Sequence, residues 1–287
     1  MIWLIGNRGM LGSDVEKLLE QRALPFITSD IDVDITDPAA LRAFAGGRQI
    51  EWIINCSAYT AVDAAEDERD KAFLINADGV MNIARLAEEK GAALIHVSTD
   101  YVFDGEKPGA YREDDATNPI GAYGESKLAG EQRIAAVMNR FFIIRTAWLY
   151  GRTGKNFLLT MIRLFGERDE VRVVADQWGS PTYTGDLAAA IVKLVDDRST
   201  RYGIYHYTNE GKTTWHEFAT EICAQARKQG LVDRDVRVVP ITTAEYPTRA
   251  RRPKNSYLSK EKIIRELGVR CRDWREALAD CIGNLRK

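Results

Sequence analysis

Residues 2–12 read Ile-Trp-Leu-Ile-Gly-Asn-Arg-Gly-Met-Leu-Gly, a short apolar run followed at once by glycines spaced G-x-x-G-x-x-G. Glycine tolerates the positive φ of a tight turn and lets a diphosphate reach the backbone N–H groups that open a helix. Apolar residues then recur at helical spacing until Pro25. The stretch therefore predicts a buried strand, a phosphate-binding turn built on Gly6, Gly9 and Gly12, and a helix packed closely on the strand.

A carboxylate follows the second strand-like run, at residues 26–28. Asp30 lies about 20 residues beyond the turn, where a dinucleotide-binding unit holds a ribose hydroxyl. Asp30 favours NADH because it repels a 2′-phosphate, whereas Arg8 in the turn favours NADPH because a guanidinium pairs with that phosphate. The residues leave both cofactors open. Asp34 and Ile35 either contact the adenine or serve as loop residues, and the pattern favours neither interpretation.

Short apolar runs alternate with helical stretches through the first half of the chain. Further strands are expected at residues 52–56, 92–98 and 141–145, and helices at 37–44, 72–90 and 123–139. Such alternation requires parallel crossovers, and nearly continuous apolar strands are typical of sheets covered on both faces. The fold class expected is α/β, a Rossmann-type doubly wound parallel sheet.

The alternation loosens beyond residue 150. Strand-like runs remain at residues 171–174 and 204–207, and amphipathic helices at 186–195, 215–228 and 273–285. We therefore expect residues 1–150 to form an NAD(P)-binding Rossmann domain and residues 151–287 a smaller C-terminal substrate-binding lobe. Part of 171–208 is expected to return to the Rossmann sheet.

Composition excludes several classes of protein. Lys and Arg number 40 and Asp and Glu 42 among the 287 residues, so a net charge of −2 gives no reason to expect a nucleic-acid partner. No segment approaches the ~20 apolar residues that span a bilayer, so no membrane partner is expected. The four cysteines form no Cys-x-x-Cys pair and the three histidines show no metal-ligand spacing. We expect a cytoplasmic protein without a structural metal.

Three further residues form a constellation suited to reducing a carbonyl. Tyr123 and Lys127 are four apart, so they share one face of the helix expected there. Thr99 follows the strand at 92–98, at the carboxyl edge where open α/β sheets bind ligands. A tyrosine with a pKa near ~10 becomes a better acid or base beside an ammonium group. Hydride transfer to a carbonyl leaves an alkoxide, which needs a positioned acid and an oxyanion partner.

Six stretches carry a family resemblance. They are NCSAYTAVD at 55–63, STDYVF at 98–103, YGESKLAGE at 123–131, RTAWLY at 145–150, QWGSPT at 177–182 and RPKNS at 252–256. Across nearly its whole length the chain resembles the dTDP-4-dehydrorhamnose reductases of the extended short-chain dehydrogenase/reductase superfamily. The resemblance implies reduction of the C4 ketone of a dTDP-sugar, dTDP-4-dehydro-L-rhamnose, by NADPH or NADH in dTDP-rhamnose biosynthesis.

The resemblance also assigns roles to individual residues. It makes Tyr123 the proton donor, Lys127 the residue that lowers its pKa and holds the nicotinamide ribose, and Thr99 the residue that orients the sugar carbonyl. Asp100 and Trp148 would contact the sugar. The cofactor would be lined by Gly9, Met10, Leu11, Asp30, Ala58, Tyr59, Thr60 and Val97. Tyr59 and Cys56 depart from the smaller or His-like residues common in the family. Magnesium is sometimes described for the family, yet no carboxylate cluster here must bind a metal.

A basic stretch, residues 249–252, lies between prolines in the lobe expected to cover the substrate. Arginine pairs with diphosphates in a bidentate manner, so we expect Arg252 to contact the substrate. Two classes of alternative function remain. One is another nucleotide-4-keto-sugar reductase; a dehydratase fits less well, because Asp100 is followed by Tyr101 rather than by a second carboxylate. The other is a non-catalytic subunit similar to the regulatory subunit of methionine adenosyltransferase. The oligomeric state, with a homodimer as the candidate, stays open.

Overall fold

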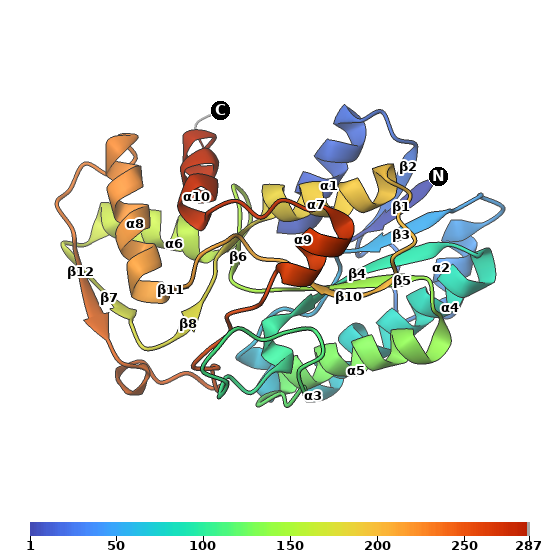
Figure 1. Ribbon diagram of the computed structural model, residues 1–287, viewed down its shortest axis with the longest axis horizontal. Coiled ribbons are helices and arrows are strands. Elements are labelled where there is room, and N and C mark those ends of the chain that lie inside the picture. Colours follow the sequence, from blue (N-terminus) through green and yellow to red (C-terminus); the bar gives the residue numbers. More distant parts are fainter. Residues whose placement is uncertain (286–287) are drawn as a thin grey trace.

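Six apolar runs form the strands of one sheet: β1 (Ile2–Ile5), β2 (Phe26–Ser29), β3 (Trp52–Asn55), β4 (Ala93–Thr99), β5 (Phe141–Thr146) and β10 (Gly203–His206). All are parallel, in the order β10-β5-β4-β3-β1-β2 (Figure 1). The computed structural model describes residues 1–285. The Rossmann-type α/β fold predicted from the alternation is thereby confirmed.

Side chains of each strand alternate between two apolar layers. In β1, Ile2 and Leu4 join one buried cluster and Trp3 and Ile5 join the other. The first layer contains residues of α1 (Met10–Gln21), α7 (Thr184–Asp196) and α9 (Glu261–Leu267); the second contains residues of α2 (Pro38–Ala45), α4 (Val80–Lys90) and α5 (Ala122–Val137). Helices therefore cover both faces of the sheet, as Figure 1 shows.

The glycine turn lies where the strand order reverses, between β1 and β3. Gly6 has a φ of +81°, which a residue with a side chain rarely adopts. A Cβ on Gly12 would lie 2.0 Å from the carbonyl oxygen of Gly6, so only glycine lets α1 approach the turn this closely. The start of α1 therefore lies at the edge where such sheets bind dinucleotides.

The helix predicted at residues 72–90 is not one regular helix. It consists of α3 (Arg69–Phe73), a π-helical turn η2 (Leu74–Gly79) and α4, which ends at Gly91 with a φ of +63°. A π turn inserts an extra residue into a helix and is frequent at functional sites. The prediction was wrong in its start and regularity, because side-chain spacing does not reveal a local change of backbone hydrogen bonding.

The remaining residues build a second, smaller core beside the sheet. Its main elements are α6 (Phe157–Glu167), β7 (Glu170–Val174), α8 (Trp215–Lys228), β12 (Arg237–Ile241) and α10 (Trp274–Gly283). β7 pairs with β12 rather than with the central sheet, whereas α7 and β10 lie with that sheet. Shorter pieces are β6 (Leu149–Tyr150), β8 (Trp178–Gly179), β9 (Thr182–Tyr183), β11 (Thr213–Thr214), η1 (Ala64–Glu66), η3 (Asp100–Val102) and η4 (Thr243–Glu245). None of the helices within residues 1–285 is long and apolar enough to cross a membrane.

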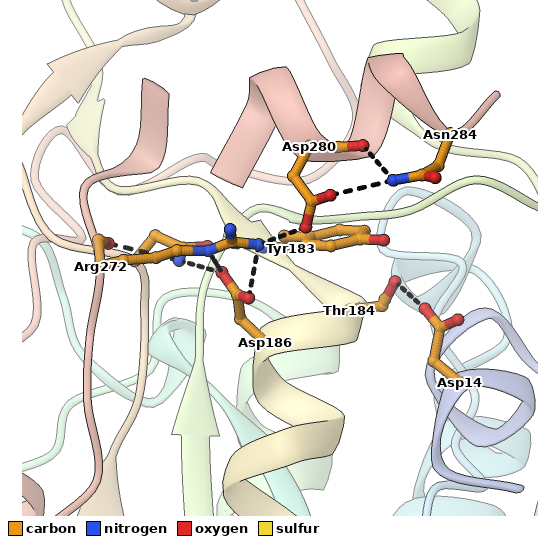
Figure 2. A network of polar contacts seen from close by, with 8 residues as sticks. Asp14, Tyr183, Thr184, Asp186, Arg272, Asp280 and Asn284 are labelled. Atoms are coloured by element: carbon orange, nitrogen blue, oxygen red, sulfur yellow. Dashed lines mark hydrogen bonds and ion pairs between the residues drawn. The ribbon is translucent and has the colours of Figure 1, made fainter. Parts of the chain in front are cut away.

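A polar network ties α7 to its neighbours on both sides (Figure 2). Asp14 of α1 accepts a hydrogen bond from the Thr184 hydroxyl at 2.6 Å. Arg272 pairs with Asp186 of α7 at 2.7 Å and with Asp280 of α10 at 2.8 Å. Thr184 and Asp186 both belong to α7, so this helix is joined to α1 directly and to α10 through Arg272.

Candidate active site

Tyr123 and Thr99 meet at the carboxyl edge of the central sheet. β4 ends at Thr99, and α5 places Tyr123 in its first turn. Burial raises the pKa of Tyr123. The Thr99 hydroxyl accepts the backbone N–H of Tyr101, the next residue but one along the chain. The ring of Tyr101 lies edge-on to that of Tyr123, with centroids 5.5 Å apart. Tyr123 therefore keeps its phenolic proton at neutral pH.

Lys127 lies one turn further along α5 and is buried. Its Nζ donates to the carbonyl oxygen of Val97 at 2.7 Å and lies 3.2 Å from Nε2 of His96. Burial lowers the pKa of Lys127 to about 8, although the Glu131 carboxylate opposes this shift. Lys127 is thus an ammonium ion at pH 7. Within residues 1–285 no hydrogen bond joins it to Tyr123, so its influence on the pKa of Tyr123 stays a prediction.

A buried ion pair supports the strand that carries Thr99. Glu131 of α5 and Arg145 of β5 are each 3% exposed and lie 2.7 Å apart at their closest atoms. The Ser98 hydroxyl also donates to Glu131, and the Arg145 guanidinium lies over the Phe103 ring. Two charged hydrogen bonds from Arg145 Nε and Nη2 hold the carboxylate in one orientation. The helix α5 and the two strands β4 and β5 are therefore joined by buried polar contacts.

Asp100 follows Thr99 and is 2% exposed. Its Oδ1 accepts the Thr99 hydroxyl at 3.0 Å, whereas its Oδ2 has no hydrogen-bond partner among residues 1–285. Burial raises the pKa of Asp100 to about 6, and the hydrogen bond from the Thr99 hydroxyl opposes that shift. A buried carboxylate oxygen without a partner is a favourable acceptor for a hydroxyl group of a ligand.

Hydrogen bonds fix several of the residues predicted to hold a dinucleotide. Asp30 accepts hydrogen bonds from the backbone N–H groups of Arg8 at 3.0 Å and Ile31 at 2.9 Å, so its carboxylate lies beside the turn. Asn76, in the π turn, bonds to both the N–H and the carbonyl of Tyr59. The clamp on Tyr59 fixes the loop that also carries Ala58 and Thr60.

Two other predicted cofactor residues have local structural partners. Asp34 accepts hydrogen bonds at 2.8 Å from both the backbone N–H and the hydroxyl of Thr36. Ile35 is 8% exposed, packs in the apolar layer and faces the α-carbon of Gly79. Their contact with an adenine stays a prediction.

The predicted substrate residues lie on segments from both halves of the chain. Trp148 has a φ of +47° and stacks on Trp215 with ring centroids 3.8 Å apart. Arg252 pairs with Asp63 at 2.7 Å and donates to the Tyr101 hydroxyl at 3.3 Å. Arg252 is therefore held against the ring that packs on Tyr123, although its guanidinium already has a carboxylate partner.

Five neighbours of the site were not assigned to it from the sequence. They are Asp63, Asn76, His96, Trp215 and Ser256. Asp63 and Ser256 lie at the ends of quoted motifs, a usable signal, whereas nothing in the spacing of the other three distinguishes them from core residues. Among residues 1–285 no group of three or more His, Cys, Asp and Glu side chains could hold a metal ion.

Comparison with known proteins matches the whole chain, residues 1–287, to the family model described as RmlD substrate binding domain. The dTDP-4-dehydrorhamnose reductase of Aggregatibacter actinomycetemcomitans is 40% identical over 285 residues, which cover 96% of each chain. A crystal structure of a dTDP-4-dehydrorhamnose reductase from Clostridium acetobutylicum superposes with a TM-score of 0.93 at 41% identity, covering 100% of this chain and 99% of that one. The Bacillus anthracis dTDP-4-dehydrorhamnose reductase, crystallised in complex with NADP, superposes with a TM-score of 0.91 at 40% identity. The match covers 98% of this chain and 97% of that one.

Proposed function

The chain belongs to the RmlD family, and from this membership we propose that it is an NAD(P)H-dependent dTDP-4-dehydrorhamnose reductase. The reaction is reduction of the C4 ketone of dTDP-4-dehydro-L-rhamnose to the alcohol of dTDP-L-rhamnose. One arrangement carries the proposal beyond membership: a buried, protonated Tyr123 packs against Tyr101, whose backbone N–H bonds to the Thr99 hydroxyl at the ligand-binding edge of the sheet. A carbonyl reductase needs that pairing of an acid with a hydroxyl group.

The glycine turn and its surroundings fit a dinucleotide. The close approach of Gly6 and Gly12 leaves no side chain between the turn and the start of α1, where a diphosphate would bind, and Asp30 lies beside the turn for a ribose hydroxyl. When bound, the reduced nicotinamide supplies the hydride that the sugar carbonyl accepts. Lys127 would hold the nicotinamide ribose with an N–H group that does not bond to Val97.

The chain's own residues then deliver one proton to the carbonyl oxygen of the sugar. The Thr99 hydroxyl, held by Asp100, lies where it can orient the carbonyl oxygen of the sugar. Tyr123 donates its phenolic proton to that oxygen as negative charge develops there, and the phenolate afterwards takes a proton from solvent. The unpaired Oδ2 of Asp100 and the stacked pair Trp148–Trp215 provide the polar and the flat apolar contacts for the sugar nucleotide.

A substrate-dependent oxidation assay tests the function. The loss of absorbance that marks oxidation of NADH or NADPH is followed with dTDP-4-dehydro-L-rhamnose and, separately, with its unepimerised 4-keto precursor. Oxidation that requires the rhamnose form supports the proposal. Selectivity for the precursor would assign the chain to another nucleotide-4-keto-sugar reductase, and a flat trace with both sugars and both cofactors would favour a non-catalytic binding subunit.

Replacing Asp30 with alanine is expected to shift cofactor preference toward NADPH. The carboxylate beside the turn repels a 2′-phosphate, and its removal leaves that phosphate free to pair with the Arg8 guanidinium. One unit charge at about 4 Å near a protein surface corresponds to roughly 1–4 kcal/mol, so the ratio of kcat/KM for NADPH over NADH should rise about tenfold or more. Glu20→Ala removes the same charge from the exposed far end of α1 and should leave the ratio unchanged. An unchanged ratio in Asp30→Ala contradicts the predicted role.

We further propose a cytoplasmic location and a homodimer. Four cysteines, Cys56, Cys223, Cys271 and Cys281, are all free thiols, which supports a reducing compartment. Light scattering of the purified chain measures the assembly directly, and a mass near the 32.3 kDa of one chain would contradict the dimer.

A further inference from the structure

Three buried polar side chains form a line beneath the candidate active site. Asn55 ends β3, His96 lies in β4, and Lys127 lies in α5; their side chains are 1%, 0% and 2% exposed. Nδ2 of Asn55 lies 3.1 Å from Nδ1 of His96, and Nε2 of His96 lies 3.2 Å from Nζ of Lys127. Each ring nitrogen of His96 thus faces a nitrogen of a neighbour.

The orientation of the Asn55 amide is fixed by the backbone N–H group of Ser57, which can only donate a hydrogen bond. Oδ1 of Asn55 accepts the backbone N–H of Ser57 at 3.0 Å and the Ser57 hydroxyl at 2.6 Å. A backbone N–H has no lone pair to offer, so the atom facing Ser57 must be the amide oxygen. The NH₂ group of Asn55 therefore points at His96, and Nδ1 of His96 must accept.

That acceptance decides where the imidazole carries its proton. Burial and the Lys127 charge lower the pKa of His96 well below its usual value, so the ring is neutral and has one N–H and one lone pair. With the lone pair of Nδ1 used by Asn55, the proton lies on Nε2 and points at Nζ of Lys127. An Nε2–H group can donate to the neutral amine of Lys127, but it has no lone pair to accept a hydrogen bond from the ammonium ion.

We propose that Asn55 locks His96 in the Nε2–H tautomer, and that His96 thereby acts as a positioning residue that stabilises the neutral amine of Lys127. Only the effect on the kcat–pH profile rests on the proposed function; the tautomer of His96 and the pKa of Lys127 do not. The groups whose charges act on Lys127 are Glu131 on its own helix, Cys56 beyond β3, and His96. Of these, only Glu131 favours the ammonium ion at neutral pH, because the pKa of Cys56 is raised to about 12.

The amine of Lys127 can satisfy every contact that surrounds it. It donates one N–H to Val97 at 2.7 Å, accepts the Nε2–H of His96, and keeps its second N–H for the cofactor ribose. The ammonium form makes the Val97 contact too, but its remaining hydrogens meet the Nε2–H of His96. Lys127 therefore changes protonation close to physiological pH, and activity that depends on the ammonium ion falls on the alkaline side as this group loses its proton.

Nitrogen NMR of the ¹⁵N-histidine-labelled protein tests the tautomer without any substrate. The chain has three histidines, and two act as internal references. His206 has Nδ1 beside the carbonyl of Tyr111, so it should carry its proton on Nδ1, whereas His216 has Nε2 beside the carbonyl of Val238. His96, assigned by its absence in His96→Phe, should show Nε2–H. A proton on Nδ1 of His96, or on both nitrogens, overturns the proposal whether or not the chain is a reductase.

Asn55→Asp tests the control of Lys127. Its carboxylate accepts a hydrogen bond, so the imidazole proton moves from Nε2 to Nδ1. The lone pair of Nε2 then accepts from the ammonium ion, and the pKa of Lys127 should rise by about one unit or more. The shift is measured as the alkaline limb of the kcat–pH profile and, independently of turnover, by Nζ NMR of ¹⁵N-lysine-labelled protein.

A double-mutant cycle separates the tautomer from simple charge. In a His96→Phe background, Asn55→Asp still adds a negative charge but has no imidazole to reorient, so the shift should be less than half as large. Equal shifts in both backgrounds overturn the proposal. If the wild-type chain reduces no sugar, the proposed function fails while the NMR readouts still decide the tautomer and the pKa of Lys127.

Discussion

Tyr123→Phe is expected to lower kcat by about 10²–10⁴-fold, because it removes the one phenolic proton placed beside Thr99. The ring stays, so packing against Tyr101 is retained. The dissociation constant for NADH or NADPH should change by less than about threefold, or roughly 0.6 kcal/mol. Steady-state kinetics with the sugar nucleotide and a fluorescence titration of the cofactor measure the two quantities separately.

Tyr101→Phe provides the matched control. It removes the same atom from the neighbouring ring, whose hydroxyl bonds to Arg252. Its kcat should fall by less than about tenfold, the loss expected for one neutral hydrogen bond. A Tyr123→Phe enzyme that turns over at the wild-type rate would exclude Tyr123 as the acid.

The second large effect is on stability. Glu131→Gln keeps the shape of the side chain but leaves Arg145 charged and 3% exposed without a counter-ion. Removing one partner of a buried ion pair costs about 3–5 kcal/mol, because the remaining charge stays desolvated. Urea unfolding followed by circular dichroism should show the free energy of unfolding lowered by that amount.

Two further variants test whether the loss of stability comes from the unpaired buried charge. Glu167→Gln breaks an exposed pair with Arg163 on α6 and should change the free energy of unfolding by about 0.5 kcal/mol or less. Replacing Glu131 and Arg145 together by leucine and methionine removes both charges, so the double variant should be more stable than Glu131→Gln. If Glu131→Gln unfolds like Glu167→Gln, the buried pair does not hold α5 against β5.

Local signals predicted the first half of the fold well. The strand, turn and helix at the N-terminus form where the glycine spacing places them, and Asp37 caps α2 through the N–H of Ala39 as its sequence suggests. α6 was overlooked although Asn156 caps it and Leu158, Met161 and Phe165 are buried at helical spacing. β12 contains Pro240, which argues against a strand unless the strand lies at an edge, as β12 does in its two-stranded sheet.

The candidate site was predictable only where its residues lie on strands and helices that the sequence predicts. Hydrophobic periodicity predicts the strand that ends near Thr99 and the helix that carries Tyr123 and Lys127. Arg252 was expected to face an anionic ligand, and its pairing with Asp63 joins residues 189 positions apart. No local signal encodes such a contact, because it depends on how the smaller core packs against the sheet.

The place of β10 in the sheet has a consequence for how the protein is made. β10 pairs with β5, yet α6, β7 and α7 are synthesised between them, and α10 is needed to complete the smaller core. A ribosome that adds about 5–20 residues per second therefore releases an unfinished sheet edge for several seconds before its last strand emerges. Neither core can close before the other is largely translated, so a nascent chain stalled midway exposes the edge of β5 to chaperones and to neighbouring chains.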